Sequence, residues 1–486
     1  MTTECSRTTL GFHPLGSREV VGKFDGGQIT SDAGGLLLRE TEAATGIIEH
    51  FAKCFTDYRN PEKIEHSVLE LLRQRIYGLA LGYEDLNDHD QLRYDPLLAV
   101  LVGKEDPLGQ DRVSAADRGK ALAGKSTLNR LELTPVRAGV KSRYKKIVAN
   151  RQGIQQYFLD VFFQAHEQPP RRLVLDLDAT DDPVHGHQSG RFFHGYYKNY
   201  CYLPLYVFCG EHLLCARLRP SNIDGSAGAL KEIQRIVVQI RARWPEVQIV
   251  VRGDSGFCRE PIMAWCEQND VDYVLGLAKN DRLIAEISPE LAAAKQEYEQ
   301  TGQASRVFKD FSYRTLDSWS RSRRVVGKAE HLAKGSNPRF VVTSLSAAEI
   351  DGRSVYEHEY CARGDMENRI KEQQLQLFAD RTSCATMRAN ELRLWLSSVA
   401  YTLLVALRRL GLQQTDFAHA QPATIRLKLL KLGARVWVTV RKVWVSLAES
   451  YPYRRVFEQA YANLRRVTER LTTSVASPPP IAVPSP

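Results

Sequence analysis

Residues 172–179 read RLVLDLDA, an apolar run that carries two aspartates near its end and has the composition of a buried strand. Two more strand-like runs follow without a helical pattern between them, and helical and strand-like patterns then alternate. In chain order the runs are residues 172–179, 202–209 and 212–219, a helix over 228–244, a strand over 247–252, a helix over 259–269, and a strand over 272–277. Three strands in succession predict a mixed sheet, because a doubly wound sheet would alternate strand and helix from its first strand.

This order is that of a ribonuclease-H-like sheet, so we expect an α/β fold: a ribonuclease-H-like mixed sheet flanked by helices, with a β-rich insertion and with helical regions at both ends of the chain. At 486 residues the chain is too long for one domain. We expect an N-terminal helical region over 1–125, the first part of the ribonuclease-H-like core over 126–284, the β-rich insertion over 285–350, the second part of the core over 351–411, a basic helical region over 412–472 and a disordered tail over 473–486.

The net charge of +9 is concentrated at one end of the chain. From residue 385 onward there are 15 Lys and Arg against 5 Asp and Glu, so the rest of the chain is nearly neutral. A localised basic segment is typical of a protein that binds a polyanion such as nucleic acid, although a solvated helix face has the same composition. No apolar run approaches the ~18 residues that a membrane span needs, and nothing marks the N-terminus for secretion, so we expect a cytoplasmic protein without membrane contact.

Two aspartates follow strands of the predicted sheet. Asp178 comes at the end of the first strand, and Asp254 directly follows a later one in VVRGDSGF. Carboxylates at adjacent strand ends can converge, and hard oxygen ligands are what Mg²⁺ prefers. Asp254 could instead cap a helix, and Asp176, Asp181 and Asp182 are alternatives to Asp178 within its cluster.

A third acid lies in the stretch YCARGDMENRIKEQQ, which starts at Tyr360. Tyr360, Arg363 and Glu367 are three and four residues apart, so on a helix they share one face. An arginine beside a carboxylate suits phosphate binding next to a metal ligand, because guanidinium pairs with phosphate oxygens through two hydrogen bonds. A surface helix with salt bridges one turn apart is the alternative interpretation.

With these residues the chain resembles the DDE transposases of bacterial insertion sequences, in the group with a Y-x2-R-x3-E-x6-K signature after a long β-rich insertion. The Asp-x-Thr of that family matches Asp178 to Thr180, its second acid matches Asp254 and its third matches Glu367. The second and third acids are 113 positions apart, which leaves room for the insertion, and the likeness covers roughly residues 32–409.

The resemblance implies a transposase that cleaves insertion-sequence ends and transfers them into target DNA. It implies that the three acids hold two Mg²⁺ ions, with Mn²⁺ as a substitute, and that the partners are terminal inverted repeats, target DNA and a second copy of the chain in a DNA synapse. It places the protein at the bacterial nucleoid. The core over 126–284 and 351–411 is then the expected catalytic core, and residues 1–125 are the expected DNA-binding region. The expected DNA-binding residues outside it are Tyr360, Arg363, Lys371 and Trp319.

Two of these four assignments have alternatives. The signature lysine falls at 374, where this chain has Gln374, so Lys371 takes its role or is only the salt-bridge partner of Glu367. Trp319 either stacks on a displaced base or packs in a core.

Three other readings of the sequence remain. A nuclease of the same fold would carry identical acids, and a DNA-binding relic would keep the basic regions. Residues 119–126, GKALAGKS, match the phosphate-loop pattern, but the polar stretch before them does not predict the strand that such a loop follows.

Overall fold

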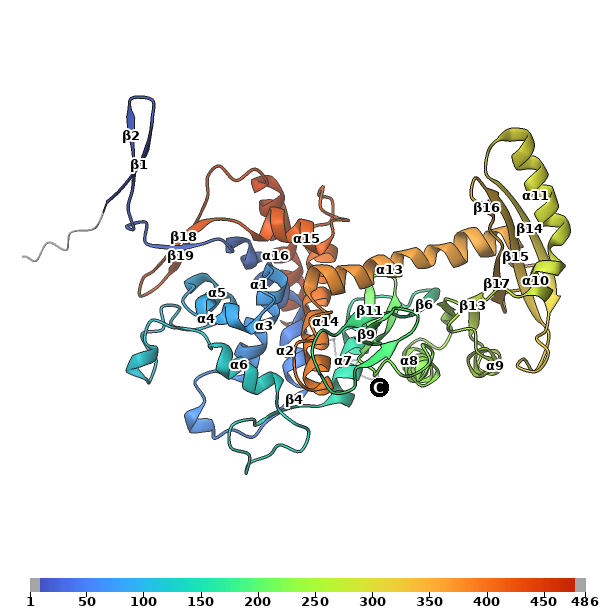
Figure 1. Ribbon diagram of the computed structural model, residues 1–486. Helices are drawn as coiled ribbons and strands as arrows, with labels where there is room; N and C mark the ends of the chain where they lie inside the picture. Colours follow the sequence, from blue (N-terminus) through green and yellow to red (C-terminus); the bar gives the residue numbers. More distant parts are fainter. Residues whose placement is uncertain (1–8, 477–486) are drawn as a thin grey trace, which may run out of the picture. The chain divides into compact units, whose positions relative to one another are not determined.

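The computed structural model describes residues 9–476, which form two compact units (Figure 1). One unit consists of the chain up to Ala149, Gln376–Phe378, and the chain from Val399 onward, and the other of Asn150–Leu375 and Ala379–Ser398. Within residues 9–476 no helix is both long and apolar enough to cross a membrane. The boundaries between the six regions expected from the sequence stay predictions.

The second unit is built on one mixed sheet. Its strands in spatial order are β11 (His212–Arg217), β10 (Leu205–Cys209), β6 (Arg172–Ala179), β12 (Gln248–Gly253), β13 (Asp272–Leu277), β17 (Arg339–Thr343), β15 (Arg323–Leu332) and β14 (Ser305–Tyr313), with β16 (Gly335–Ser336) beside β15. β6 pairs antiparallel with β10 and parallel with β12, and β12 is parallel to β13. The predicted fold, a ribonuclease-H-like mixed sheet flanked by helices, is confirmed.

The predicted β-rich insertion extends this same sheet. β17 pairs antiparallel with β13, and β15 and β14 continue outward from it. Two helices, α10 (Asp281–Glu286) and α11 (Ser288–Thr301), precede the strands, and α11 packs along β14 and β15 (Figure 1). The insertion therefore widens the central sheet and does not form a sheet of its own.

Helices cover both faces of the sheet. On one face Leu175 and Ile249 belong to a core with α7 (Arg151–Gln164), α8 (Ala229–Arg243) and α9 (Glu260–Gln268). Because side chains alternate along a strand, the neighbouring positions point to the other face, where Val250 and Val274 pack against the segment η5 (Val355–Tyr360). The predicted signature motif thus begins over the second face.

A buried ion pair lies on this second face. Asp176 on β6 accepts two hydrogen bonds from Arg252, its register partner on β12. The remaining guanidinium nitrogen of Arg252, Nη1, donates to the carbonyl oxygen of Glu359 at 2.6 Å. Asp176 and Arg252 are 4% and 7% exposed, so the pair joins two strands to η5 in a place with little water.

The first unit is helical at its centre. Its helices are α1 (Leu36–Thr45), α2 (Ile47–Ala52), α3 (Val68–Leu81), α4 (His89–Leu92), α5 (Pro96–Val102), α6 (Lys125–Glu132), α15 (Pro422–Ile425), α16 (Arg454–Ala476) and the C-terminal half of α14 (Met387–Leu410). Near the N-terminus the strands β1 (Leu10–Leu15) and β2 (Arg18–Gly22) form a hairpin. The phosphate-loop-like residues 119–126 follow no strand; they run into α6.

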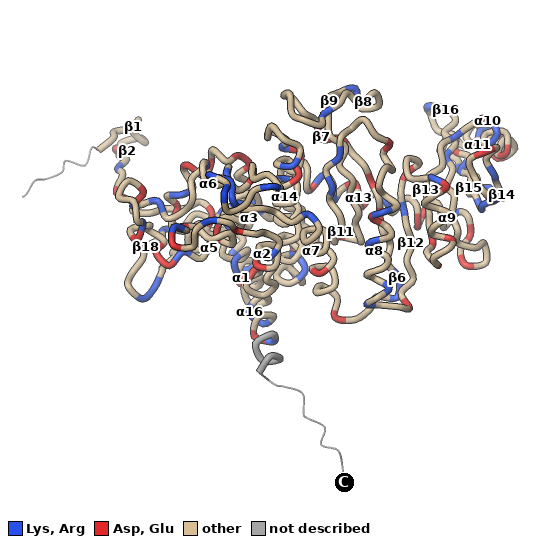
Figure 2. The backbone as a smooth tube through the Cα atoms, turned by 90° about the horizontal axis from the view of Figure 1, so that it is seen from below, with Lys and Arg blue, Asp and Glu red and all other residues tan. Residues whose placement is uncertain are grey.

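The prediction of a helical region over 412–472 is wrong in its middle. β18 (Ala434–Val438) and β19 (Val443–Leu447) form a hairpin, and β18 also pairs with β3 (Gln28–Thr30). Both strands are rich in Val and Trp, which favour β-structure, and β3 supplies a third strand from far away in the chain. The loop between β18 and β19 is blue in Figure 2 because it carries Arg441 and Lys442.

The predicted disordered tail over 473–486 is also wrong at its start. Helix α16 continues to Ala476, so residues 473–476 are helical. Residues 477–486 lie outside the described residues.

The Asp176–Arg252 pair gives a test of the sheet. The substitution Arg252→Ala leaves a buried carboxylate without its partner, and we expect the free energy of unfolding to fall by about 3–5 kcal/mol. Chemical denaturation followed by tryptophan fluorescence measures the loss. The double variant Asp176→Leu/Arg252→Met removes both charges and should regain most of the stability. A loss under about 1 kcal/mol in the single variant, typical of a surface pair, would contradict this role.

Candidate active site

The first two acids lie at neighbouring strand ends. Asp178 is the next-to-last residue of β6, and Asp254 follows the last residue of β12, whose Gly253 is in register with Leu177. Each carboxylate is held by a backbone amide: Oδ1 of Asp178 accepts from its neighbour Ala179, and Oδ1 of Asp254 accepts from Gly256, both at 2.9 Å. The parallel pairing of the two strands thus brings these acids to one edge of the sheet.

Arg363 connects the third acid, Glu367, to Asp178 at this edge. Nη1 of Arg363 lies 3.8 Å from Oδ2 of Asp178, and Nη2 donates to Oε1 of Glu367 at 2.5 Å. The guanidinium therefore lies between the first and third acids of the predicted triad. It compensates negative charge there, as a bound cation would.

The helix that carries these residues changes its winding along its length. It passes from the π-helical η5 through the 3-10 turn η6 (Cys361–Arg363) into α13 (Gly364–Lys371), and a second π-helical segment, η7 (Glu372–Gln376), follows. π-helical turns are rare and occur often at functional sites, because they re-aim side chains within a helix. Here they flank the segment that carries Arg363 and Glu367.

The Tyr360 hydroxyl and the backbone of Asp254 and Ser255 all lie close to Gly276 of β13. A Cβ atom on Gly276 of β13 would lie 2.6 Å from the Tyr360 hydroxyl oxygen, 3.0 Å from the backbone nitrogen of Ser255 and 3.3 Å from the backbone carbonyl carbon of Asp254. Burial raises the pKa of Tyr360, Arg363 lowers it in part, and Asp254 raises it further. Tyr360, Arg363 and the acids therefore act on one another electrostatically.

Burial makes the Asp178 carboxylate costly to ionise. It raises the pKa of Asp178 to about 6, Arg363 opposes the rise, and the carboxylates of Asp254 and Glu367 add to it. Among residues 9–476 no three His, Cys, Asp or Glu side chains are gathered as a ligand set in this conformation, in which Arg363 is the charged neighbour of Asp178. The oxygen donors have the chemistry that Mg²⁺ prefers.

The alternatives to Asp178 have other partners. Asp176 is bound by Arg252, and Asp181 accepts a hydrogen bond from Asn199 at 3.0 Å. Asp182 is fully buried, and burial raises its pKa to about 8. These contacts favour Asp178 as the member of its cluster that faces the other acids.

Gln374, at the position of the signature lysine, has a structural partner. Its side-chain amide donates to Oδ1 of Asp182 at 2.7 Å and to the carbonyl oxygen of Asp181 at 3.1 Å, so it fixes the loop after β6. Lys371 is exposed at the end of α13, and Glu367 pairs with Arg363. Within the described chain no carboxylate lies within ion-pair distance of Lys371, which leaves its amine exposed.

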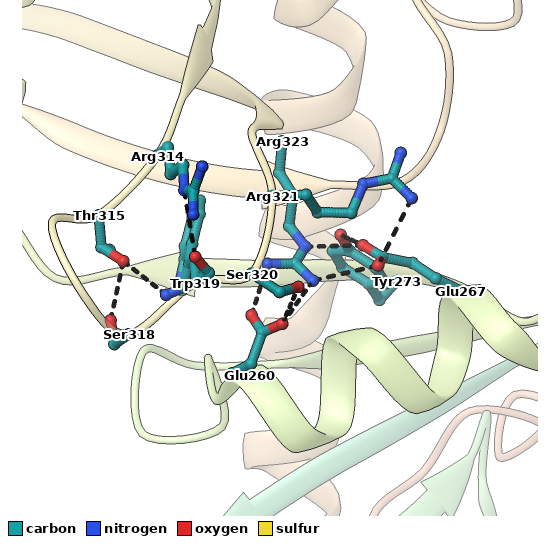
Figure 3. A network of polar contacts seen from close by, with 10 residues as sticks. All are labelled: Glu260, Glu267, Tyr273, Arg314, Thr315, Ser318, Trp319, Ser320, Arg321 and Arg323. Carbon is teal, nitrogen blue, oxygen red and sulfur yellow. Dashed lines mark hydrogen bonds and ion pairs between the residues drawn. The ribbon is translucent and has the colours of Figure 1, made fainter.

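Trp319 is buried, and Figure 3 shows it in the same network of polar contacts as Arg314, Thr315 and Arg323. Its side chain is 4% exposed, meets Tyr313 edge to face with ring centroids 5.8 Å apart, and lies under the guanidinium of Arg323 at 5.4 Å. Arg323 is held in turn by Glu260 and Glu267. This is the core packing that the sequence allowed as the alternative, and base stacking by Trp319 stays a prediction that would require the ring to leave this position.

The polar cavity in this part of the sheet is separate from the acids. Its volume is about 380 Å³, and its lining includes Asp272, the first residue of β13. Gly276, beside Tyr360, lies near the other end of the same strand. The cavity therefore does not belong to the acidic cluster.

Sequence reasoning missed Tyr197. Its hydroxyl donates to the carbonyl oxygen of Ala179 at 3.1 Å, and burial raises its pKa, as do the carboxylates of Asp181 and Asp178. It lies between β8 (Phe192–His194) and β9 (Asn199–Tyr202), in a loop rich in tyrosine. Only the aromatic composition of that loop hinted at a role.

The sheet has the strand order of a ribonuclease-H-like fold, and two of the predicted acids lie at one edge of it. A family model described as "Transposase DDE domain group 1" matches residues 12–469, and the chain belongs to that family. The family uses divalent metal ions in general. Among solved structures the chain is similar to the cryo-EM structure of a piggyBac transposase synaptic complex with hairpin DNA, at 11% identity and a TM-score of 0.40, over 94% of this chain and 87% of that chain. No curated protein matches.

Gly276 gives a test of the site's geometry. Gly276→Ala places a methyl group against the Tyr360 hydroxyl and the Asp254 backbone, and we expect the single-turnover rate of DNA strand cleavage to fall by about tenfold or more, because small displacements of reacting groups are costly. Adding Tyr360→Phe removes the closest contact and should restore part of the rate. Gly364→Ala, at a helical glycine with open space around its Cβ position, is the control and should cleave normally. Equal rates for the two glycine variants would contradict the assignment.

Asp182 predicts a pH dependence of stability. Its pKa is raised from 3.8 to about 8 in the folded chain, so unfolding releases its proton between these values. The stability contribution is present below pH 3.8 and is lost as pH rises toward 8, by about 1.4 kcal/mol per pH unit. Urea denaturation at pH 5 and pH 8 should therefore show a steeper loss for the native chain than for Asp182→Asn. Parallel losses in the two proteins would refute the assignment.

Proposed function

We propose that this transposase cleaves the ends of an insertion sequence and joins them to target DNA, with Asp178, Asp254 and Glu367 as its catalytic acids. The observation that carries the proposal is the meeting of Asp178 and Asp254 at one sheet edge, with Arg363 bridging Asp178 to Glu367. Membership of the transposase family supports the reaction class.

The three acids would hold Mg²⁺, for which Mn²⁺ can substitute. Bound Mg²⁺ would stabilise the charge on the attacking and leaving oxygens of an in-line displacement at phosphorus. The raised pKa of Asp178 supports this use, since a buried carboxylate without enough positive charge nearby is the group that gains most from a cation.

We propose that Arg363 exchanges its carboxylate partners for a phosphate group when DNA binds. Without DNA its guanidinium is paired with Asp178 and Glu367. A phosphate group can accept two parallel hydrogen bonds from one guanidinium, so arriving DNA would take Arg363 and free both carboxylates. Tyr360 would hold the Asp254 loop beside it, and the exposed Lys371 would contact the DNA backbone.

The partners follow from the reaction. Cleavage and joining both act on phosphodiesters of double-stranded DNA, and two terminal inverted repeats must be processed together. We therefore propose that the chain works as a homodimer in a DNA synapse, with its basic C-terminal part contributing to DNA binding.

The test uses DNA that carries the element's own ends. With Mg²⁺ the native chain should cut and join these ends, and Asp254→Ala should bind the DNA but lose both activities by at least about a thousandfold, the scale expected for loss of a charge-stabilising group. Labelled strands separated on denaturing gels measure both steps. Glu299→Ala, which removes a carboxylate that is 62% exposed on α11, is the control and should act as the native chain does.

Three results would change the proposal. Cleavage without joining would make the chain a nuclease, and binding without cleavage by the native chain would make it a DNA-binding relic. Full activity of Asp254→Ala would remove the acid from the mechanism.

A further inference from the structure

One face of the sheet β3-β18-β19 in the first unit is exposed and aromatic. Arg435 and Trp437 of β18 point to this face, opposite Ser446 and Trp444 of β19, and Ile29 of β3 is the register partner of Arg435. On the opposite face Val436 is buried. The strands are therefore anchored on one side and open on the other.

The open face is organised around two tryptophans. Their rings stack with centroids 5.9 Å apart and an angle of 12° between planes, and Trp437 and Trp444 remain 42% and 46% exposed. Nζ of Lys442 lies 5.2 Å from the Trp444 ring centroid. In contrast to Trp319, this pair lies outside any core, and such exposed aromatic groups mark interaction surfaces.

The charge around the pair has one sign. Residues 417–448 contain six Lys and Arg and no Asp or Glu. Three of the six have partners within the first unit: Arg426 donates to the carbonyl of Ala80, Lys431 pairs with Asp32, and Lys428 lies over the rings of Phe417 and Tyr453.

The other three cations are Arg435 on β18 and Arg441 and Lys442 in the loop between β18 and β19. All three are exposed, and none has a carboxylate within ion-pair distance in the described chain. Three cations without a nearby carboxylate suit a polyanion, because each phosphate contact releases condensed counterions.

We propose that this face is a binding surface for double-stranded DNA, with Arg435, Arg441 and Lys442 on the phosphates. A two-stranded antiparallel ribbon fits the major groove of duplex DNA, and the indole N–H groups are donors that phosphate oxygens accept. The inference deepens the proposed function by naming a DNA contact remote in sequence from the three acids.

The experiment measures binding without cleavage. A fluorescein-labelled, random-sequence duplex is titrated with the full chain in EDTA, at several salt concentrations. For Arg435→Ala/Arg441→Ala/Lys442→Ala we expect Kd to rise at least about tenfold and the slope of log K against log salt to become shallower by about 2 to 3, because each lost phosphate contact removes about 0.9.

Matched variants isolate the face. Lys231→Ala/Lys295→Ala/Lys334→Ala removes the same charge from exposed positions in the second unit and should bind as the native chain does. Arg441→Ala/Lys442→Ala changes only exposed loop residues and should weaken DNA binding as well. It replaces the triple variant in the test if circular dichroism shows that the triple variant is unfolded. Trp437→Ala/Trp444→Ala, tested alongside, should weaken binding as well.

The outcomes separate this inference from the proposed catalysis. Equal weakening by both charge-removal triples, weakening only with single-stranded DNA, or a change of oligomeric state with unchanged duplex binding would overturn it. Native cleavage activity together with native-like DNA binding by the hairpin variants would also overturn it, and would leave the proposed reaction intact. Binding that depends on the hairpin in a chain that never cuts would sustain it and reject the reaction.

Discussion

The buried pair between Asp176 and Arg252 is the constraint on which the site depends. It ties β6 to β12 on the face that carries the acids, and its third contact fixes the carbonyl of Glu359, one residue before Tyr360. Because an ion pair in a dry environment is costly unless its geometry is satisfied, few arrangements of strand and helix are compatible with it. The positions of Asp178, Asp254 and Arg363 follow from that arrangement.

The charge of the acidic cluster is compensated differently from that of Asp176. Asp178 is surrounded by carboxylates and by apolar structure, so its charged form needs a counter-charge. Arg363 supplies it from the helix above, and the same guanidinium has the geometry to bind phosphate. In the proposed exchange of partners, DNA would take this arginine and leave both carboxylates open to a cation.

Gln374 illustrates how one substitution changes the use of a position. A lysine there would bring a charge toward the loop after β6, whereas the glutamine amide donates to Asp182 and its neighbour. The loop is thereby fixed by neutral hydrogen bonds around a carboxyl group whose pKa is strongly raised. The sequence indicated that the lysine was missing, but the partner of its replacement lies 192 positions away and was not predictable.

The sequence by itself determined the order of strands and helices around residues 172–277 and the acids after two of those strands, because both depend on local apolar periodicity. Only the tertiary structure decided which aspartate of the first cluster faces the others, since Arg252, Asn199 and Gln374 select among them through long-range contacts. It also decided that residues 434–447 are strands, because β3 pairs with them from the other end of the chain. Local pattern sets the elements, and contacts between distant segments choose the partners of each charged group.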